Sequence, residues 1–262
     1  MERRREPLPT RVMDTRPLPA GYGRALDAGL TALAISLDDA ARNAIDGHVR
    51  LLLAWTRAIN LTAIRDPARV ALGHVVDSLC GHDLISDLAP RRVLDLGSGG
   101  GFPGLPLGAT LRDRHPDVEV TLLEPIGKKA RFLETAVGAT GLAKTVRVET
   151  ARAEDLARAS EPSSWDVITA RAVAVTADLV ELAFPLLTPD GTLVAWKRGD
   201  ITDELTAANR AVDALGGGSV RVVDVAVPGL DQHHLVAITR SMPGTVPSIY
   251  PRDPAVRKRR PW

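Results

Sequence analysis

The amino-acid sequence predicts an α/β fold, in which a mostly parallel seven-stranded sheet ends in an antiparallel hairpin and follows a helical cap. From residue 91 onward, short β-branched runs alternate with helix-length stretches, which indicates βαβ units and a sheet covered on both faces. The last two runs, 220–227 and 233–240, have only five residues between them. Five residues cannot hold a crossover helix, so that pair must be antiparallel. Before residue 91 the patterns are helical only.

The composition indicates one large domain, or one domain with an attached subdomain. The chain has 262 residues, 45% of them hydrophobic and only 3% aromatic, so Leu, Val, Ala and Ile must form most of the core. Cys80 is the only cysteine, which excludes an intrachain disulfide and argues against a zinc site built on cysteines. With no secretory signal and no long apolar run, we expect a cytoplasmic protein that binds neither membrane nor metal.

The two ends of the chain differ from its middle. Residues 1–23 are rich in Arg and Pro without periodicity, and we expect them to be disordered. Residues 243–262 form a basic tail, whose last twelve residues hold five Lys and Arg against one Asp, a net charge of +4. Such a tail is either an arm that seeks phosphates or a solvated, disordered end.

Residues 24–90 are expected to form the helical cap. Apolar residues at steps of three and four, from Ala41 to Ile59, predict one long amphipathic helix. Ser36 and Asp39 stand where an N-cap and its reciprocal partner would lie, and Asn60 is a plausible C-terminal stop. A second, shorter helix is expected over residues 70–85.

Residues 91–242 are expected to form the main domain. Its five helix-separated strands are predicted at 91–97, 118–124, 145–151, 165–172 and 191–199. The helical stretches between and after them are 104–114, 127–141, 176–187 and 201–215. Five such strands followed by an antiparallel hairpin describe the sheet of nucleoside-cofactor methyltransferases, whereas a dinucleotide dehydrogenase would continue with parallel strands.

A glycine-rich loop, "DLGSGGGFPGLP", joins the first strand to the first helix of this domain. Three ligands compete for such a loop. A P-loop is excluded because no Lys follows the glycines. The dinucleotide pattern G-x-G-x-x-G is met formally by Gly99, Gly101 and Gly104, but Pro103 interrupts it.

The loop also fits the pattern D-x-G-x-G-x-G, through Asp95, Gly97, Gly99 and Gly101. S-adenosylmethionine carries a cationic sulfonium and an amino group, which a carboxylate at a strand end would attract, whereas it would repel a pyrophosphate. This register favours S-adenosylmethionine over NAD.

Two further acidic residues follow strands of this sheet. Glu124 ends the second strand, where an acid can accept hydrogen bonds from ribose hydroxyls, although NAD enzymes use an acid there too. Ala153 and Glu154 follow the third strand, where an adenine edge would lie. Glu154 is equally explained as an acid in the first turn of a helix.

Eight motifs that occur in order resemble one known family. They are "NLTAI" (60–64), "HVVDSL" (74–79), "VLDLGSGGGFPGLPL" (93–107), "LLEPIGKKARFL" (122–133), "RAED" (152–155), "ITARAVA" (168–174), "AWKRGD" (195–200) and "YPRDPAVRKRRP" (250–261). Over about residues 35–261 the chain is similar to the bacterial 16S rRNA guanine-N7 methyltransferases, methyltransferase G of the small subunit, formerly called glucose-inhibited division protein B.

The resemblance implies a Rossmann-like class I methyltransferase with S-adenosylmethionine as cofactor. Its substrate would be a guanosine N7 in 16S rRNA, presented by the small ribosomal subunit or an assembly intermediate. The family's cofactor contacts correspond here to Gly97, Phe102, the Ala153–Glu154 pair and Arg171. The chain departs from the family in its longer Arg/Pro-rich N-terminus, and in His233 and His234, which stand where a basic residue is expected.

The chemistry of each methyl acceptor agrees with that implication. Methylation of cytosine C5 needs a cysteine nucleophile, but Cys80 lies before the first strand and is expected to be a small buried residue. The Asp/Asn-Pro-Pro-aromatic loop typical of exocyclic amine methylation is absent after the fourth strand. Guanine N7 has a free lone pair and no proton to remove, so we expect no general base and assign no catalytic residue.

Basic residues at the carboxyl edge of the sheet are the candidates for RNA contact. Arg171 ends the fourth strand, and Lys197 and Arg198 end the fifth. Each could instead form a salt bridge with a nearby carboxylate. Exposed cations of the helix after Glu124, among them Lys129, are expected to be a solvated face.

Three further residues complete the assignments. His74 and Asp77, three residues apart, are expected to be a structural pair that docks the cap, and Trp55 to be a core residue. The cofactor-binding candidates are Asp95, Gly97, Ser98, Gly99, Gly101, Phe102, Glu124, Ala153, Glu154 and Arg171. The RNA-binding candidates are Arg171, Lys197, Arg198, Arg252, Lys258, Arg259 and Arg260.

The leading hypothesis is a monomeric rRNA methyltransferase. The alternatives are an NAD(P)-dependent oxidoreductase and a non-catalytic rRNA-binding protein that keeps a methyltransferase fold.

Overall fold

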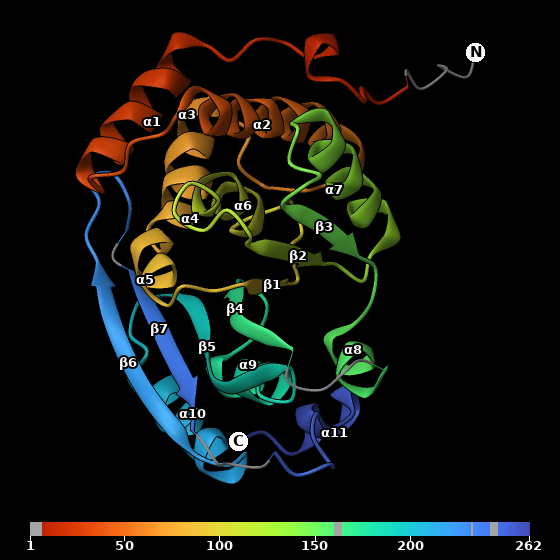
Figure 1. Ribbon diagram of the computed structural model, residues 1–262, viewed down its shortest axis with the longest axis vertical. Helices are drawn as coiled ribbons and strands as arrows, with labels where there is room; N and C mark the ends of the chain where they lie inside the picture. Colours follow the sequence, from red (N-terminus) through yellow and green to blue (C-terminus); the bar gives the residue numbers. More distant parts are fainter. Residues whose placement is uncertain (1–6, 160–163, 232, 242–245) are drawn as a thin grey trace.

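The computed structural model describes residues 7–159, 164–231, 233–241 and 246–262. Its strands form one sheet in the order β3-β2-β1-β4-β5-β7-β6 (Figure 1). The pairs from β3 to β5 are parallel, whereas β7 runs antiparallel to both β5 and β6. This topology confirms the predicted fold. The strands are β1 (Arg92–Leu96), β2 (Glu119–Leu123), β3 (Val146–Glu149), β4 (Trp165–Arg171), β5 (Leu187–Arg198), β6 (Gly218–Val225) and β7 (His233–Arg240).

Helices cover both faces of the sheet, because successive strand residues point to opposite sides. Val93 of β1 belongs to one apolar cluster and the next residue, Leu94, to the other. The first cluster contains side chains of α2 (Asp39–Ile59), α6 (Gly104–Leu111) and α7 (Gly127–Ala139). The second contains side chains of α9 (Thr176–Ala183) and α10 (Thr202–Ala214). Among the residues that the structure describes, no helix is both long and apolar enough to cross a membrane.

The long helix α2 carries the predicted apolar stripe but begins at a different cap. Ala41, Ile45 and Trp55 are buried along one side of the helix. Asn60 adopts the left-handed conformation with φ of 50° and ends the helix, as predicted. The N-cap, however, is Asp38, whose carboxylate accepts a hydrogen bond from the amide of Ala41. The expectation of Ser36 as N-cap is therefore wrong.

The second helical stretch of the cap is interrupted. It consists of α3 (Pro67–Val70), a π-helical segment η2 (Ala71–Val76), α4 (Asp77–Leu79) and α5 (His82–Asp87). The wider turn of a π segment shifts side chains out of the α-helical register, and such turns are frequent at functional sites. His74 lies within η2 and Asp77 follows it directly.

Residues 7–23 are ordered, which corrects the expectation that residues 1–23 are disordered. They include η1 (Val12–Asp14) and the start of α1 (Ala20–Ala32). Side chains of α2 hold this segment: Arg50 donates to the carbonyl of Thr15, and Trp55 donates to the carbonyl of Pro9. An aperiodic segment is thus fixed by long-range contacts. Residues 1–6 lie outside the described residues.

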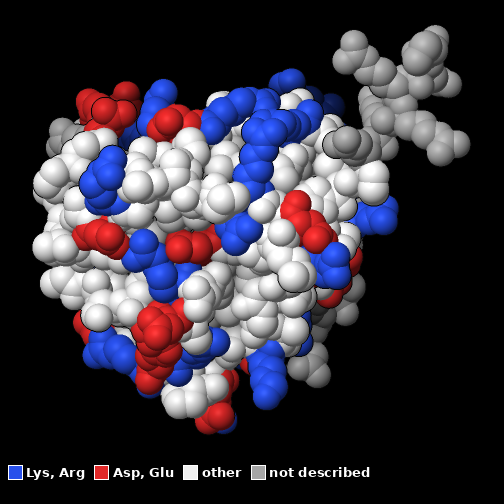
Figure 2. Space-filling view, turned by 90° about the horizontal axis from the view of Figure 1, so that it is seen from above, with Lys and Arg blue, Asp and Glu red and all other residues white. Residues whose placement is uncertain are grey.

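The face of the molecule that carries α1 and α2 shows basic and acidic side chains interspersed among uncharged ones (Figure 2). Basic side chains adjoin one another in the upper middle of this view, and acidic side chains lie beside them.

The C-terminal residues 246–262 fold back onto the sheet domain instead of trailing from it. They contain α11 (Pro254–Arg259), in which Asp253 caps the helix by accepting from the amide of Ala255. In Figure 1 this helix lies beside α8 (Ala153–Ala159). Helix α8 is not among the predicted helical stretches, although a helix was one explanation of Glu154. Residues 243–245 of the expected tail lie outside the described residues.

The position of the α2 cap can be tested by substitution. Asp38→Ala should lower the free energy of unfolding by about 1 kcal/mol, because the amide of Ala41 loses its acceptor. Ser36→Ala is the matched control and should change it by only a few tenths of a kcal/mol. Urea denaturation measures both, and equal losses would contradict Asp38 as the cap.

Candidate active site

A cleft of about 620 Å³ opens at the carboxyl ends of β1, β4 and β5, between the sheet and the helical cap. Its volume lies within the ~300–1,000 Å³ typical of small-molecule sites. The sheet contributes the glycine-rich loop and the ends of β4, β5 and β7. The cap contributes the loop after α2 and side chains of η2 and α4. Ligands of open parallel sheets bind at this edge.

The glycine-rich loop keeps its main chain exposed to the cleft. Gly97, Gly99 and Gly101 have φ angles of 65°, 55° and 88°, a left-handed region that side chains with a Cβ rarely adopt. Gly97, Ser98 and Gly99 line the cleft, as does Phe102. The structure thus brings four of the predicted cofactor-binding residues to one wall, whereas Gly101 does not line it.

Asp95 supports this loop from beneath and does not line the cleft. It is fully buried, and its carboxylate accepts from the amide of Gly104 at 3.2 Å and from the hydroxyl of Thr169 at 2.8 Å. Burial raises the pKa of Asp95 to about 6, against the opposing effect of its hydrogen bonds. The expectation of a carboxylate that faces the positive charge of the cofactor is therefore corrected.

Glu124 supports the loop from the neighbouring strand. Its two carboxylate oxygens accept from the amides of Gly99 at 2.9 Å and Ile126 at 2.8 Å. A carboxylate offers about four acceptor positions, so two remain for other donors. Glu124 is buried at the end of β2, where the sequence placed it.

Phe102 is packed among three polar side chains. Its ring centroid lies 4.6 Å from that of His48 and 4.8 Å from that of His74, and the guanidinium of Arg171 lies 5.4 Å above it. His48 Nε2 contacts the carbonyl of Gly100 at 2.7 Å, which ties α2 to the glycine-rich loop. Phe102 thus forms an apolar floor with a cation over one face.

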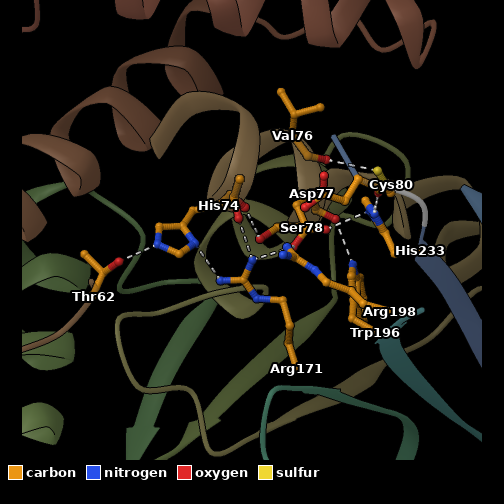
Figure 3. A network of polar contacts seen from close by, with 12 residues as sticks. Thr62, His74, Val76, Asp77, Ser78, Cys80, Arg171, Trp196, Arg198 and His233 are labelled. Carbon is orange, nitrogen blue, oxygen red and sulfur yellow. Dashed lines mark hydrogen bonds and ion pairs between the residues drawn. The ribbon is translucent and has the colours of Figure 1, made fainter. Parts of the chain in front are cut away.

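Asp77 is the centre of the polar network in the cleft (Figure 3). Its side chain is only 2% exposed, and its two oxygens lie 2.5 Å from Arg171 Nη1 and 2.9 Å from His233 Nε2. Its main-chain carbonyl accepts from the indole of Trp196 at 2.7 Å. Burial acts to raise the pKa of Asp77, but His233 and Arg171 outweigh it and hold the pKa below its usual value.

Arg171 joins Asp77 to His74. It donates to the carbonyl of Gly73 at 3.2 Å and to His74 Nδ1 at 3.1 Å. Because Nδ1 accepts, the proton of the neutral ring lies on Nε2, which is 2.6 Å from the hydroxyl of Thr62. Burial and the charge of Arg171 lower the pKa of His74 to about 4. His74 and Asp77 therefore dock the cap on the sheet, as expected, and both also line the cleft.

His233 takes part in this network from the start of β7. Its Nδ1 lies 2.5 Å from the carbonyl of Asp231, and its Nε2 lies 2.9 Å from the carboxylate of Asp77. Both neighbouring groups are acceptors, which favours the protonated ring. Contact with Asp77 raises the pKa of His233, against burial. The adjacent His234 contacts Asp224 at 2.6 Å and is likewise placed between acceptors.

The cations predicted to contact RNA fall into two groups. Lys197 is paired with Glu204 at 2.5 Å, and Arg171 with Asp77, so the salt-bridge interpretation holds for both. Arg198 remains 56% exposed at the cleft, 3.9 Å from Asp77. Lys129 also lines the cleft, which corrects its assignment to a solvated face.

In the C-terminal segment, two assignments from the sequence change. Arg252 is paired with the buried carboxylate of Glu181 at 2.6 Å and is not a free RNA contact. Glu154 is buried and paired with Arg257 at 2.5 Å, while Ala153 begins α8 beside it. Lys258, Arg259 and Arg260 are exposed.

The surroundings of Cys80 agree with the expectation that it is not a nucleophile. Its thiol donates to the carbonyl of Val76, and burial raises its pKa to about 12. Within the part of the chain that the structure describes, no group of three or more His, Cys, Asp or Glu could hold a metal ion.

Sequence reasoning missed most of the cleft's cap side. Neither Thr62 of the cap nor Trp196 of β5 was singled out as a site residue, and the partner of Trp196, Asp77, lies 119 residues away. The strongest available signal was the spacing of His74 and Asp77 in one motif, whose common partner Arg171 is more than ninety residues away.

A family model described as rRNA small subunit methyltransferase G matches residues 41–236. A protein named Ribosomal RNA small subunit methyltransferase G from Roseiflexus castenholzii is 42% identical over 212 residues, which cover 80% of this chain and 87% of that protein. The protein of the same name from Chloroflexus aggregans is 40% identical over 241 residues, which cover 91% and 97%.

Solved structures share the fold at low sequence identity. An O-methyltransferase from Bacillus cereus in complex with SAH has a TM-score of 0.57 and 17% identity, with 82% of this chain and 97% of that chain covered. The O-methyltransferase TomG from Streptomyces achromogenes, in complex with SAM, has a TM-score of 0.55 and 16% identity, with 83% and 96% covered. These likenesses show a common class I methyltransferase fold.

Removal of the Asp77 charge should destabilise the protein. Asp77→Asn leaves Arg171 and His233 buried without their counter-ion, for which the expected loss is about 3–5 kcal/mol in the free energy of unfolding. Asp83→Asn is the control, because the Asp83 side chain is 69% exposed and its removal should cost little. Chemical denaturation at pH 7 compares them, and a small loss for Asp77→Asn would contradict the central role of this carboxylate.

The buried neutral histidines predict a loss of stability in mild acid. Burial lowers the pKa of both His48 and His74 to about 4, whereas histidine in the unfolded chain has a pKa near 6.5. Between these values the unfolded state binds protons that the folded state excludes. Stability should therefore fall with decreasing pH, by up to about 1.4 kcal/mol per pH unit for each histidine.

Denaturation at several pH values between 6.5 and 5 measures this slope. His48→Gln should reduce the slope of the free energy of unfolding against pH by the part that one histidine contributes. His233 affects this slope only above pH 6.5, because its pKa in the folded protein is raised. An unchanged slope in the variant would refute the assignment.

Proposed function

The chain belongs to the rRNA small subunit methyltransferase G family, and on that basis we propose that it transfers a methyl group from S-adenosylmethionine to N7 of a guanosine in bacterial 16S rRNA. The proposed partner is the small ribosomal subunit or one of its assembly intermediates. The proposal includes a cytoplasmic location and action as a monomer.

The residues of the cleft fit S-adenosylmethionine. The volume suits a ligand of this size, and the left-handed glycines leave main-chain atoms open to it. Arg171 lines the cleft and would hold an anionic group such as the carboxylate of the cofactor. Glu124, buried behind Gly99, has two carboxylate acceptor positions beyond its two amide contacts, which hydroxyl groups would use. When bound, the cofactor supplies an electrophilic methyl group on a sulfonium. Phe102 would offer it an apolar surface.

The observation that carries the proposed chemistry is that the potential bases lining the cleft are all engaged. His74 accepts from Arg171, Asp77 is paired with Arg171 and His233 and lies 3.9 Å from Arg198, and His233 lies between the carbonyl of Asp231 and the carboxylate of Asp77. In the described lining, no imidazole or carboxylate is left to remove a proton. Guanine N7 needs no such base, so orientation of the acceptor by the cleft can supply much of the rate.

We propose that Arg198, Lys129 and the exposed cations of the C-terminal segment contact RNA phosphates. Arg198 and Lys129 line the cleft, from β5 and from α7. About half or more of the hydrogen bonds in nucleic-acid complexes go to phosphate and sugar groups, and these contacts set the register of the substrate.

Neither alternative hypothesis is favoured. In the sheet, β7 lies next to β5 and runs antiparallel to it, whereas a dehydrogenase is expected to continue with parallel strands. The intact glycine-rich loop with Glu124 beneath it argues against a protein that has lost its cofactor.

Transfer of labelled methyl groups tests the proposal. Purified protein, labelled S-adenosylmethionine and 30S subunits that lack the modification should yield labelled N7-methylguanosine in 16S rRNA after nucleoside mapping. Label in another nucleoside would refute the N7 assignment, and no label in either 30S subunits or naked 16S rRNA would refute the activity.

The cleft cations give a second prediction. Arg198→Gln should raise KM for the RNA substrate several-fold and change the affinity for S-adenosylmethionine much less, because the Arg198 side chain is 56% exposed and its contact with Asp77 is long, at 3.9 Å. Arg221→Gln, on the edge strand β6, serves as a surface control. A lower affinity for the cofactor with normal KM for RNA would contradict the assignment.

A further inference from the structure

The last thirteen residues, 250–262, form a strap that two carboxylates of the sheet domain hold in place. The carboxylates are Glu181 of α9 and Glu154 of α8, and both are buried. The strap thus joins the helices that follow β3 and β4 in the chain.

Glu181 anchors the first and last parts of the strap together. Its side chain is 0% exposed and accepts from the main-chain amide of Arg252 at 2.6 Å and from the Arg252 guanidinium at 2.6 Å. It also accepts from the indole of Trp262 at 2.9 Å. The Arg252 guanidinium lies 4.7 Å from the Trp262 ring centroid, and Tyr250 stacks on the same ring. This arrangement fixes both ends of the strap at one point.

Glu154 anchors the middle of the strap. Its carboxylate meets the guanidinium of Arg257 at 2.5 Å, with side chains only 8% and 11% exposed. Arg257 lies in α11, so this pair fixes the helix against the start of α8. The Glu154 carboxylate therefore has a partner within the chain, distinct from the cofactor contact that the family resemblance implies.

The strap carries positive charges that the two anchoring carboxylates do not neutralise, and these lie together at the end of α11. Of the five cations of the strap, Arg252 and Arg257 are neutralised by carboxylates of the domain, and Asp253 caps α11. The remaining three, Lys258, Arg259 and Arg260, are consecutive and exposed at the end of α11. They form a fixed group of three positive charges, the chemistry that recognises the phosphates of an RNA backbone.

Buried ion pairs contribute little net stability, because the cost of desolvation offsets much of the attraction, whereas their loss displaces the groups that they hold. Resting on the proposed function, we infer that Glu154 and Glu181 are positioning residues, which hold the strap so that residues 258–260 bind phosphates of the rRNA substrate. A tail without anchors would carry the same charges but would lose conformational entropy whenever RNA ordered it.

The salt dependence of RNA binding tests this inference. Binding of full-length protein to unmodified, in vitro transcribed 16S rRNA is measured at several salt concentrations, and calorimetry measures the affinity for S-adenosylmethionine. The triple variant Lys258→Gln, Arg259→Gln, Arg260→Gln should lower the salt slope by about 2–3, at roughly 0.7–0.9 per phosphate contact. Glu154→Ala should lower it by about 1 or more and weaken RNA binding several-fold.

Controls separate positioning from a general structural effect. Asp155→Ala removes an exposed carboxylate of the same helix and should change nothing. Arg257→Ala should reproduce Glu154→Ala, and the exchanged pair Glu154→Arg with Arg257→Glu should restore part of the salt slope. Added to the triple variant, Glu154→Ala should have no further effect on RNA binding, because it acts through the three cations.

Two results would overturn the inference. One is a normal salt slope in Glu154→Ala, with or without weaker cofactor binding, and the other is an additive effect in the background of the triple variant. If Glu154→Ala does not fold, Arg257→Ala decides by the same criteria. Failure of the proposed function is distinguishable, because the unchanged protein would then not methylate N7 of a guanosine in 16S rRNA, whatever the salt slopes of the variants.

Discussion

The cleft depends on one buried carboxylate. Asp77 belongs to the helical cap, but its partners belong to the ends of three strands: Arg171 of β4, Trp196 of β5 and His233 of β7. A carboxylate that is almost fully buried must be paired, and here only the sheet supplies its counter-charges. The cap can therefore sit in one position only, and that position leaves the cleft open between cap and glycine-rich loop. The π segment before Asp77 also places His74 against Arg171 and Phe102.

Buried carboxylates also hold the glycine-rich loop, on the side of the loop that faces the sheet. Asp95 and Glu124 each use their carboxylate to accept from loop amides, so the acids that the motif displays act first on the protein's own main chain. Attraction between the Asp95 carboxylate and the positive charge of the cofactor is therefore not the reason why the loop favours S-adenosylmethionine over NAD. Asp95 orients the loop and the start of α6, while Arg171 is among the charged side chains that line the cleft.

Local patterns predicted the fold well, because strand length, β-branching and a five-residue connection are properties of adjacent residues. Each of the seven strands and the antiparallel hairpin lies where these patterns place it. The site was predicted less completely. The contacts of Asp77 with Arg171 and of Glu154 with Arg257 join residues about a hundred positions apart, and spacing in one sequence carries no information about such pairs.

The lack of information about distant contacts also explains why the two ends of the chain were expected to be disordered. Residues 7–19 and 250–262 have compositions typical of disorder, yet single side chains such as Arg50 and Glu181 hold them against the domain. Composition measures how much apolar surface a segment can bury, but a few buried, charge-assisted hydrogen bonds can order a segment that buries little.

His233 shows how a departure from the family pattern can preserve its physics. The resemblance leads one to expect a basic residue before the last strand, and the chain has two histidines there. The ring nitrogens of His233 lie between two acceptors, the carbonyl of Asp231 and the carboxylate of Asp77. Contact with Asp77 raises the pKa of His233 against burial, so the carboxylate that attracts Arg171 also favours a positive charge on this imidazole. A histidine at this position can therefore carry the positive charge that the family pattern leads one to expect. That charge depends on pH, whereas lysine or arginine would keep it.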